Sequence, residues 1–112
     1  MRTPERGDLV WVDFDPQSGR EQAGRRPALV LTPSAYNRVV GLAVFCPVTN
    51  QAKGYPFETA LPSGLRVQGV VLADHVRSLD WRTRRAEFIC AAPADVVEHV
   101  TAKVQALISS ED

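Results

Sequence analysis

The chain has 112 residues, a size that excludes two separate hydrophobic cores, so a single domain over residues 1–112 is expected. Hydrophobic residues make up 45% of the sequence and charged residues 23%, values that argue against intrinsic disorder. Thirteen basic and thirteen acidic residues give a formal net charge of zero. This balance excludes a protein that coats nucleic acid by bulk charge, and any such contact must be local.

The first half of the chain predicts three strands. Residues 8–14 have the alternation and the aromatic and β-branched residues of a strand. A glycine-rich charged loop follows, and it ends at Arg26, directly before Pro27. The proline ring favours extended backbone at Arg26 and opens a second, apolar strand at residues 28–32. Arg26 is therefore expected where a loop meets the rim of a sheet.

One short helical turn at residues 33–37, ended by Asn37, is expected before the third strand at residues 41–49. Pro47 indicates a bend near the end of that strand. Three further strands are predicted at residues 57–61, 67–76 and 86–91, with Gly69 marking a bulge.

Only the C-terminal segment has helical periodicity. Pro93 suits a first helical position, and apolar residues then recur at steps of three and four, namely Val97, Val100, Val104, Leu107 and Ile108. A helix of this kind must lay its apolar stripe on the rest of the domain. We therefore expect a mainly β fold, a small and strongly bent antiparallel barrel with one C-terminal helix packed on it.

The two cysteines, Cys46 and Cys90, lie inside apolar runs, which predicts buried, unreactive thiols and no disulfide. Neither has a companion at metal-binding spacing. The first seven residues lack the apolar core of a signal peptide, and no apolar run approaches membrane-spanning length. We expect a cytoplasmic protein with no cofactor, no metal and no membrane contact.

Four blocks of sequence, at residues 7–16, 21–31, 47–58 and 69–81, occur in an order and at spacings that are specific together. Through them the chain resembles MazF/PemK-type toxins of bacterial type II toxin–antitoxin systems over nearly its whole length. The resemblance implies an SH3-like barrel and a homodimeric, metal-independent endoribonuclease. Such an enzyme cuts single-stranded RNA, with mRNA the expected target, at short sequences and thereby inhibits translation and growth.

The resemblance also implies a cognate antitoxin. We expect an acidic, partly disordered polypeptide that folds over the RNA groove, because a neutral protein with local positive patches suits coupled folding and binding. Contact with DNA is expected only through the toxin–antitoxin complex.

The resemblance places the catalytic pair of the family on Arg26 and Thr49. Metal-free cleavage uses the 2′-hydroxyl of the RNA as nucleophile and leaves a 2′,3′-cyclic phosphate and a 5′-hydroxyl end. A guanidinium offers forked donors and a permanent charge to the phosphorane, and a threonine hydroxyl adds a further donor. Because the pKa of arginine exceeds about 12, it is a poor general base. Glu21 is a candidate base, although it could equally read a base edge or orient Arg26.

Four more residues are assigned to RNA binding, and three of them, Phe14, Lys53 and His75, have a plainer alternative. Phe14 stacks on a base or fills the rim of the barrel. Lys53 contacts a phosphate or is an ordinary exposed lysine. Asp74 precedes His75, where the family commonly has glutamine. His75 alters base preference, titrates near neutral pH, or is simply a hydrogen-bonded rim residue.

Asp13 and Asp15 have the spacing of a metal-binding pair, but their place at a turn favours a structural role. Two other functions compete with the nuclease. Some toxins of this barrel type poison DNA gyrase without catalysis, and a plain SH3-like interaction module would explain the barrel alone. The pair Arg26 and Thr49 favours the nuclease, because neither alternative needs it.

Overall fold

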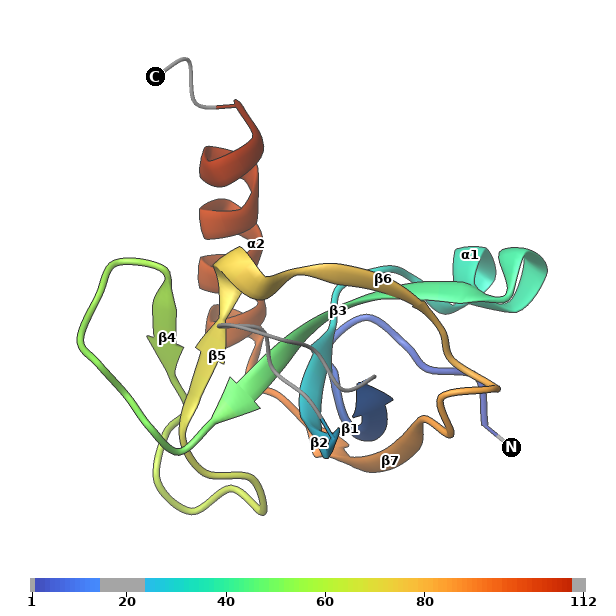
Figure 1. The fold of residues 1–112 in the computed structure, drawn as a ribbon, viewed down its shortest axis with the longest axis horizontal. Coiled ribbons are helices and arrows are strands. Elements are labelled where there is room, and N and C mark those ends of the chain that lie inside the picture. Colours follow the sequence, from blue (N-terminus) through green and yellow to red (C-terminus); the bar gives the residue numbers. More distant parts are fainter. Residues whose placement is uncertain (1, 15–23, 110–112) are drawn as a thin grey trace.

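The computed structural model describes residues 2–14 and 24–109. In chain order the elements are β1 (Asp8–Phe14), β2 (Gly24–Val30), α1 (Ser34–Val40), β3 (Leu42–Thr49), β4 (Glu58–Ala60), β5 (Val70–Leu72), η1 (Ala73–His75), β6 (Arg77–Asp80), β7 (Glu87–Ala91) and α2 (Ala94–Ser109). Neighbouring strands are antiparallel in the order β4-β5-β3-β2-β1-β7, and β6 also pairs with β3 (Figure 1). The predicted bent antiparallel fold with a C-terminal helix is confirmed, although in the described residues the sheet does not close.

The central strands are buried on both faces. Leu9, Leu29 and Cys46 contribute to one apolar cluster, which α2 covers, whereas their neighbours Val10 and Phe45 contribute to a second. Successive side chains of a strand point to opposite faces, so the two clusters lie on opposite sides of the bent sheet. Burial on both faces explains why these strands read as continuous apolar runs.

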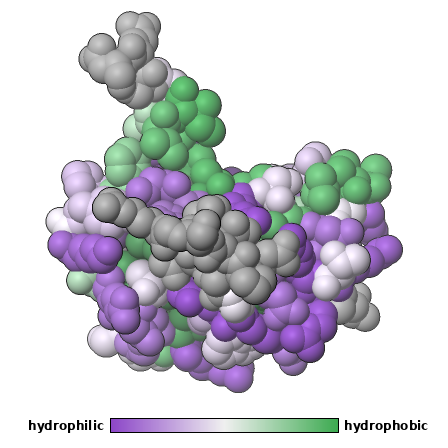
Figure 2. Space-filling view, viewed as in Figure 1, coloured by the Kyte–Doolittle hydropathy of each residue, from purple (hydrophilic) through white to green (hydrophobic). Residues whose placement is uncertain are grey.

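Helix α2 packs with only part of its apolar stripe. Val97, Val100 and Val104 are buried against the barrel, as expected, but Leu107 and Ile108 are 38% and 75% exposed. The helix projects beyond the sheet, and the apolar end of its described part stands clear of the hydrophilic face (Figures 1 and 2). The prediction that the whole stripe is covered holds only for its first part.

Helix α1 is longer than the single turn expected from the sequence. Asn37 does not end it but sits in its middle, fully buried, and the helix continues to Val40 before Gly41 caps it with a φ of 83°. The Asn37 side chain donates to the carbonyls of Pro4 and Thr32, each at 2.9 Å, and accepts from the Thr32 hydroxyl at 2.7 Å. The polar side chain is therefore a fully bonded part of the core.

A single strand over residues 67–76 is a wrong prediction. The chain pairs as β5 at Val70–Leu72, turns through η1, and pairs again as β6 with the opposite end of β3. The apolar run continues through this turn because Ala73 is buried as well, so hydrophobicity alone gave no sign of a break.

Both cysteines are free thiols. Cys46 is fully buried, and burial raises the pKa of its thiol to about 12, with a smaller contribution from the charge of Asp74. Cys90 is half-buried. In the described part of the chain, no helix is long and apolar enough to cross a membrane.

Candidate active site

The candidate site lies where β2 and β3 part. Their ladder runs from Val30 opposite Phe45 to Ala28 opposite Pro47. The next residue of β2, Pro27, has no N–H to donate, and the ladder ends there. The same offset carried two residues further would set Arg26 opposite Thr49.

Instead of pairing with β2, this end of β3 pairs with β5 on its other edge, so that Thr49 lies opposite Val70. A groove of about 440 Å³ occupies the fork between the two strands. Its lining includes Arg26 from β2, Thr49 from β3 and the half-exposed ring of Trp11 from β1. The structure therefore brings Arg26 and Thr49 to one groove, as their predicted partnership requires.

Arg26 is not at the opening of a strand, which corrects the prediction that β2 begins at residue 28. The strand begins at Gly24, and Arg26 lies within it, opposite the buried Val12 of β1. Pro27 is tolerated inside β2 because its ladder with β3 starts only at the following residue, which leaves Pro27 paired on one side alone. The half-buried Arg26 is therefore held by a strand rather than by a loop.

Thr49 is fixed from two sides. Its hydroxyl oxygen accepts a hydrogen bond from the backbone N–H of Gln51 at 3.1 Å, so the hydroxyl keeps its own proton for donation to another oxygen. On the backbone side, Gly69 has a φ of 119°, and a Cβ there would lie 2.3 Å from the Thr49 carbonyl oxygen. Only glycine allows this approach.

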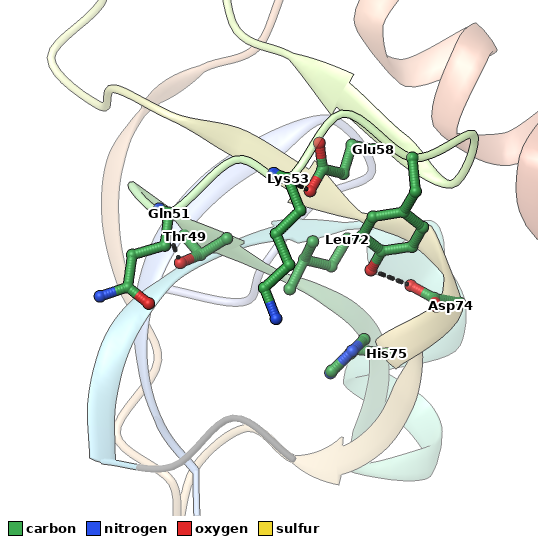
Figure 3. A pocket seen from close by; sticks show the side chains of 8 residues that line it. Thr49, Gln51, Lys53, Glu58, Leu72, Asp74 and His75 are labelled. Carbon is green, nitrogen blue, oxygen red and sulfur yellow. Dashed lines mark hydrogen bonds between the residues drawn. The ribbon is translucent and has the colours of Figure 1, made fainter. Parts of the chain in front are cut away.

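A second cavity of about 330 Å³ adjoins Thr49; we call it the rim pocket. It is lined by Thr49, Gln51, Lys53, Tyr55, Glu58, Leu72, Asp74 and His75. Figure 3 shows Lys53 reaching across its middle, between Thr49 and the η1 residues Asp74 and His75. Because Thr49 lines both cavities, the rim pocket and the Arg26 groove share a border.

Hydrogen bonds fix the wall of the rim pocket. The Tyr55 hydroxyl donates to Asp74 Oδ1 at 3.0 Å, and burial together with this carboxylate raises the pKa of Tyr55 to about 12, so the phenol stays a donor at neutral pH. The Glu58 carboxylate accepts the backbone N–H groups of Lys53 and Gly54, each at 2.9 Å. Glu58 therefore shapes the loop that carries Lys53 and Tyr55.

Three of the residues predicted to bind RNA, Lys53, Asp74 and His75, thus meet in one pocket beside Thr49. Phe14 does not join them: its ring is 2% exposed and packs in the second apolar cluster, 5.8 Å from the Arg77 guanidinium. Base stacking by Phe14 is therefore wrong, and its alternative role of filling the barrel is correct. Glu21 lies outside the described residues.

The contacts of Asp13 are those of a structural residue, the role that the sequence favoured over metal binding. Asp13 Oδ2 lies 2.7 Å from Arg85 Nε and Oδ1 lies 2.9 Å from Arg25 Nη1. These two guanidinium groups, Arg85 first, lower the pKa of Asp13 to about 2. Asp15 is outside the described residues, and elsewhere in the described chain no three His, Cys, Asp or Glu side chains group as a metal site would require. The structural reading of Asp13 agrees with these contacts.

Sequence reasoning assigned no site role to Trp11, Tyr55 or Glu58. Tyr55 and Glu58 lie inside the sequence block at residues 47–58, and Trp11 lies inside the block at residues 7–16. The sequence blocks therefore contained all three residues but did not indicate a role for any of them. The hydrogen bond that places the Tyr55 hydroxyl reaches Asp74 in a distant segment, and the Glu58 carboxylate binds backbone N–H groups, so residue spacing alone predicts neither contact.

The chain is similar in fold and in sequence to known proteins. A crystal structure of MazF from Deinococcus radiodurans superposes with a TM-score of 0.92 at 61% identity, covering 96% of this chain and 98% of that one. MazF in a MazE–MazF crystal structure from the same organism superposes with a TM-score of 0.88 at 59% identity, covering 99% and 100%. The endoribonuclease toxin MazF of Escherichia coli K12 is 49% identical over 94% of each chain.

A family model described as the PemK-like, MazF-like toxin of type II toxin–antitoxin systems matches residues 5–108. That match spans every strand and nearly all of α2, including both sides of the fork and the rim pocket. This chain therefore belongs to the PemK-like, MazF-like toxin family.

Proposed function

We propose that this protein is an endoribonuclease toxin that cleaves single-stranded RNA, with mRNA as its target, at short sequences. The observation that carries the proposal is the fork between β2 and β3, where Arg26 and Thr49 line one groove in a chain 49% identical to a named endoribonuclease toxin. The gyrase-binding alternative gives this pair no task, and no feature of the described residues favours it.

In the proposed reaction the 2′-hydroxyl of the RNA gives up its proton and its oxygen attacks the adjacent phosphorus. The bond from phosphorus to the 5′-oxygen then breaks, and that oxygen takes up a proton as it leaves. The products are a 2′,3′-cyclic phosphate and a 5′-hydroxyl end. Arg26 stabilises the charge that develops on the phosphorane oxygens, because its charge is permanent and its donors are held by a strand. Thr49 donates a hydrogen bond from its hydroxyl to the same oxygens.

The rim pocket is suited to the bases that flank the scissile bond. It combines the cationic donor of Lys53 with two acceptors, the carboxylate of Asp74 and the oxygen of Tyr55, whose proton already goes to Asp74, and base edges carry both donors and acceptors. Selection of a short sequence is therefore proposed to occur beside Thr49. His75, at the end of η1, is proposed to contact RNA there.

Control by a cognate antitoxin is the second part of the proposal. A relative at 59% identity has been solved as a MazE–MazF complex. An acidic, partly disordered antitoxin segment lying over the Arg26 groove would block RNA directly. The active form is proposed to be a homodimer located in the cytoplasm, and light scattering on the purified protein measures the oligomeric state.

Cleavage of two matched oligonucleotides tests the activity. One is all-RNA with a site mapped by end sequencing, and the other carries a single 2′-deoxy residue at the nucleotide that supplies the attacking hydroxyl. We expect cleavage of the first, in the presence of EDTA, and none of the second at that bond. Equal cleavage of both would contradict 2′-hydroxyl attack, and absence of any RNA cleavage would overturn the proposed activity.

A further inference from the structure

A lysine of α2 reaches the strand that begins behind the rim pocket. Lys103 Nζ donates to the backbone carbonyl oxygen of Glu58 at 2.6 Å and to Thr59 Oγ1 at 3.0 Å. Lys103 lies beside the buried stripe of α2, one residue before Val104, and is itself half-buried. A cation in this setting requires hydrogen-bond acceptors, and β4 supplies them.

These contacts continue directly into the pocket wall. The residue whose carbonyl receives Lys103 is Glu58, and the carboxylate of the same residue binds the N–H groups of Lys53 and Gly54. Figure 3 shows Glu58 beside Lys53 at the back of the pocket. Two successive interactions, Lys103 with the Glu58 carbonyl and the Glu58 carboxylate with the loop N–H groups, therefore connect α2 to the loop that presents Lys53 and Tyr55.

We infer that Lys103 is a positioning residue for RNA selection, acting on the rim pocket through Glu58 rather than touching RNA. The inference rests on the proposed endoribonuclease function. Without the ammonium group, the start of β4 loses its tie to α2, and the carboxylate of Glu58 no longer holds residues 53–55 in one place. The lining of the Arg26 groove includes neither Glu58 nor Lys103.

The chain offers a matched control. Arg6 also joins α2 to the barrel with a cationic side chain, donating to the carbonyl of Leu31 at 3.0 Å and to Thr101 Oγ1 at 3.2 Å. Neither the Arg26 groove nor the rim pocket includes Arg6. Arg6→Met and Lys103→Met thus both remove a cationic tie of α2, but only the second leads to the rim pocket.

The first measurement needs no activity. Amide hydrogen exchange of the full-length protein is followed by NMR for wild type, Lys103→Met and Arg6→Met. We expect the Lys53 and Gly54 amides to exchange at least about tenfold faster in Lys103→Met and at the wild-type rate in Arg6→Met, after correction for global stability. Unchanged exchange at both amides in a folded Lys103→Met protein would overturn the inference whether or not the protein cleaves RNA.

The second measurement is steady-state cleavage of the mapped RNA oligonucleotide. We expect Lys103→Met to raise KM about tenfold with kcat within about twofold of wild type, because a small misplacement of contact groups weakens substrate binding while the Arg26 groove stays intact. Lys103→Arg, which keeps a donor, should recover most of the loss, and Arg6→Met should match wild type. A fall in kcat with unchanged KM, or equal effects of both methionine variants, would contradict the inference.

Salt dependence separates positioning from direct contact. If Lys103 bound a phosphate, its removal would reduce the slope of log KM against log salt by about one, whereas a positioning role leaves the slope unchanged. A reduced slope would make Lys103 an RNA ligand and overturn the inference. If wild-type protein cleaves no RNA, the proposed function fails, while the exchange experiment still decides whether Lys103 holds the loop.

Discussion

The two ends of strand β3 use polar residues in opposite ways. At its first end, the Asn37 side chain, the Thr32 hydroxyl and the Trp81 indole are bonded to one another or to backbone, and Asn37 and Trp81 are buried. At its last end, Thr49 and the side chains around it line two adjoining cavities. Polar groups that satisfy one another stabilise a fold, whereas polar groups that converge on an open space are available to a ligand.

The comparison therefore predicts a separation of effects. Substitutions at the Asn37 end should lower the free energy of unfolding and leave the chemistry of the folded molecules unchanged. Substitutions of the side chains that line the cavities at the Thr49 end should lower activity and leave the unfolding free energy nearly unchanged. Two experiments test this division directly, a third addresses the backbone behind Thr49, and a fourth addresses an ion pair outside both ends.

Arg26→Ala should give the largest effect. Removing a preorganised charge stabiliser is expected to lower kcat for RNA cleavage about 10²- to 10³-fold, because the developing phosphorane charge loses its donor. The measurement is single-turnover cleavage, with circular dichroism and the urea midpoint as the control for folding. A folded Arg26→Ala protein that cleaves at the wild-type rate would remove Arg26 from the proposed mechanism.

Asn37→Ala tests the other end. It removes the Asn37 partner of the Pro4 carbonyl, the Thr32 carbonyl and the Thr32 hydroxyl proton at a buried or partly buried site, and the free energy of unfolding is expected to fall by about 3 kcal/mol. Urea denaturation measures this loss. Cleavage per folded molecule should stay within about twofold of wild type, and a large specific loss of activity would break the division between the two ends.

Gly69→Ala addresses the backbone behind Thr49. A Cβ 2.3 Å from the Thr49 carbonyl oxygen, on a residue with a φ of 119°, requires the chain to move. We expect a loss of about 2 kcal/mol of unfolding free energy together with reduced cleavage, because the shift displaces Thr49. Gly64→Ala is the control, since its φ is 93° but its Cβ would meet nothing within 4 Å. Equal behaviour of the two variants would show that the backbone angle alone matters.

Asp13→Asn should give the smallest effect, and only in acid. The folded pKa of Asp13, about 2, lies below its ordinary value of 3.8, so the unfolded state takes up the proton first as pH falls. The stabilisation by Arg85 and Arg25 is therefore present above about pH 4 and is lost as pH falls towards 2.

Because the Asp13 carboxylate is partly exposed, its ion pairs are worth about 1 kcal/mol or less. Urea unfolding of wild type and Asp13→Asn at pH 6 and pH 2.5 measures the difference, which should shrink at the lower pH. A difference that grows at pH 2.5 would contradict the assigned pKa shift.

The sequence was most informative where its pattern is local. Strand β1, the end of β3 at Thr49 and the start of α2 follow from alternation, apolar runs and the proline before the helix. The break between β5 and β6 was not predictable, because the buried Ala73 continues the apolar run through the turn. The role of Asn37 was missed for a similar reason: asparagine commonly ends a helix, and its burial depends on partners from distant segments.

For the candidate site, the sequence blocks indicated candidate residues, and the structure showed which of them lie together. Lys53, Asp74 and His75 were assigned together and do meet. Phe14 was misassigned, because a strand aromatic next to aspartates reads like an exposed stacking residue although its ring points into the core. Glu58 was unassigned because its role depends on backbone N–H groups, which the sequence does not display.

Burial of β2 and β3 on both faces affects how the register of their pairing is fixed. When a strand is half-buried, sliding it by one residue exposes its apolar side chains, and this penalty fixes the pairing. In a strand buried on both faces this penalty is absent, because a shift of one residue moves each apolar side chain from one buried face to the other. Here the register of β2 against β3 is fixed near α1. The Leu31 N–H donates to the Val44 carbonyl, and the Val44 N–H donates to the Thr32 hydroxyl oxygen. The same register, carried beyond the end of the ladder, would set Arg26 across from Thr49, and both residues line one groove. These hydrogen bonds at one end of β3 therefore help to align the proposed chemistry at the other end.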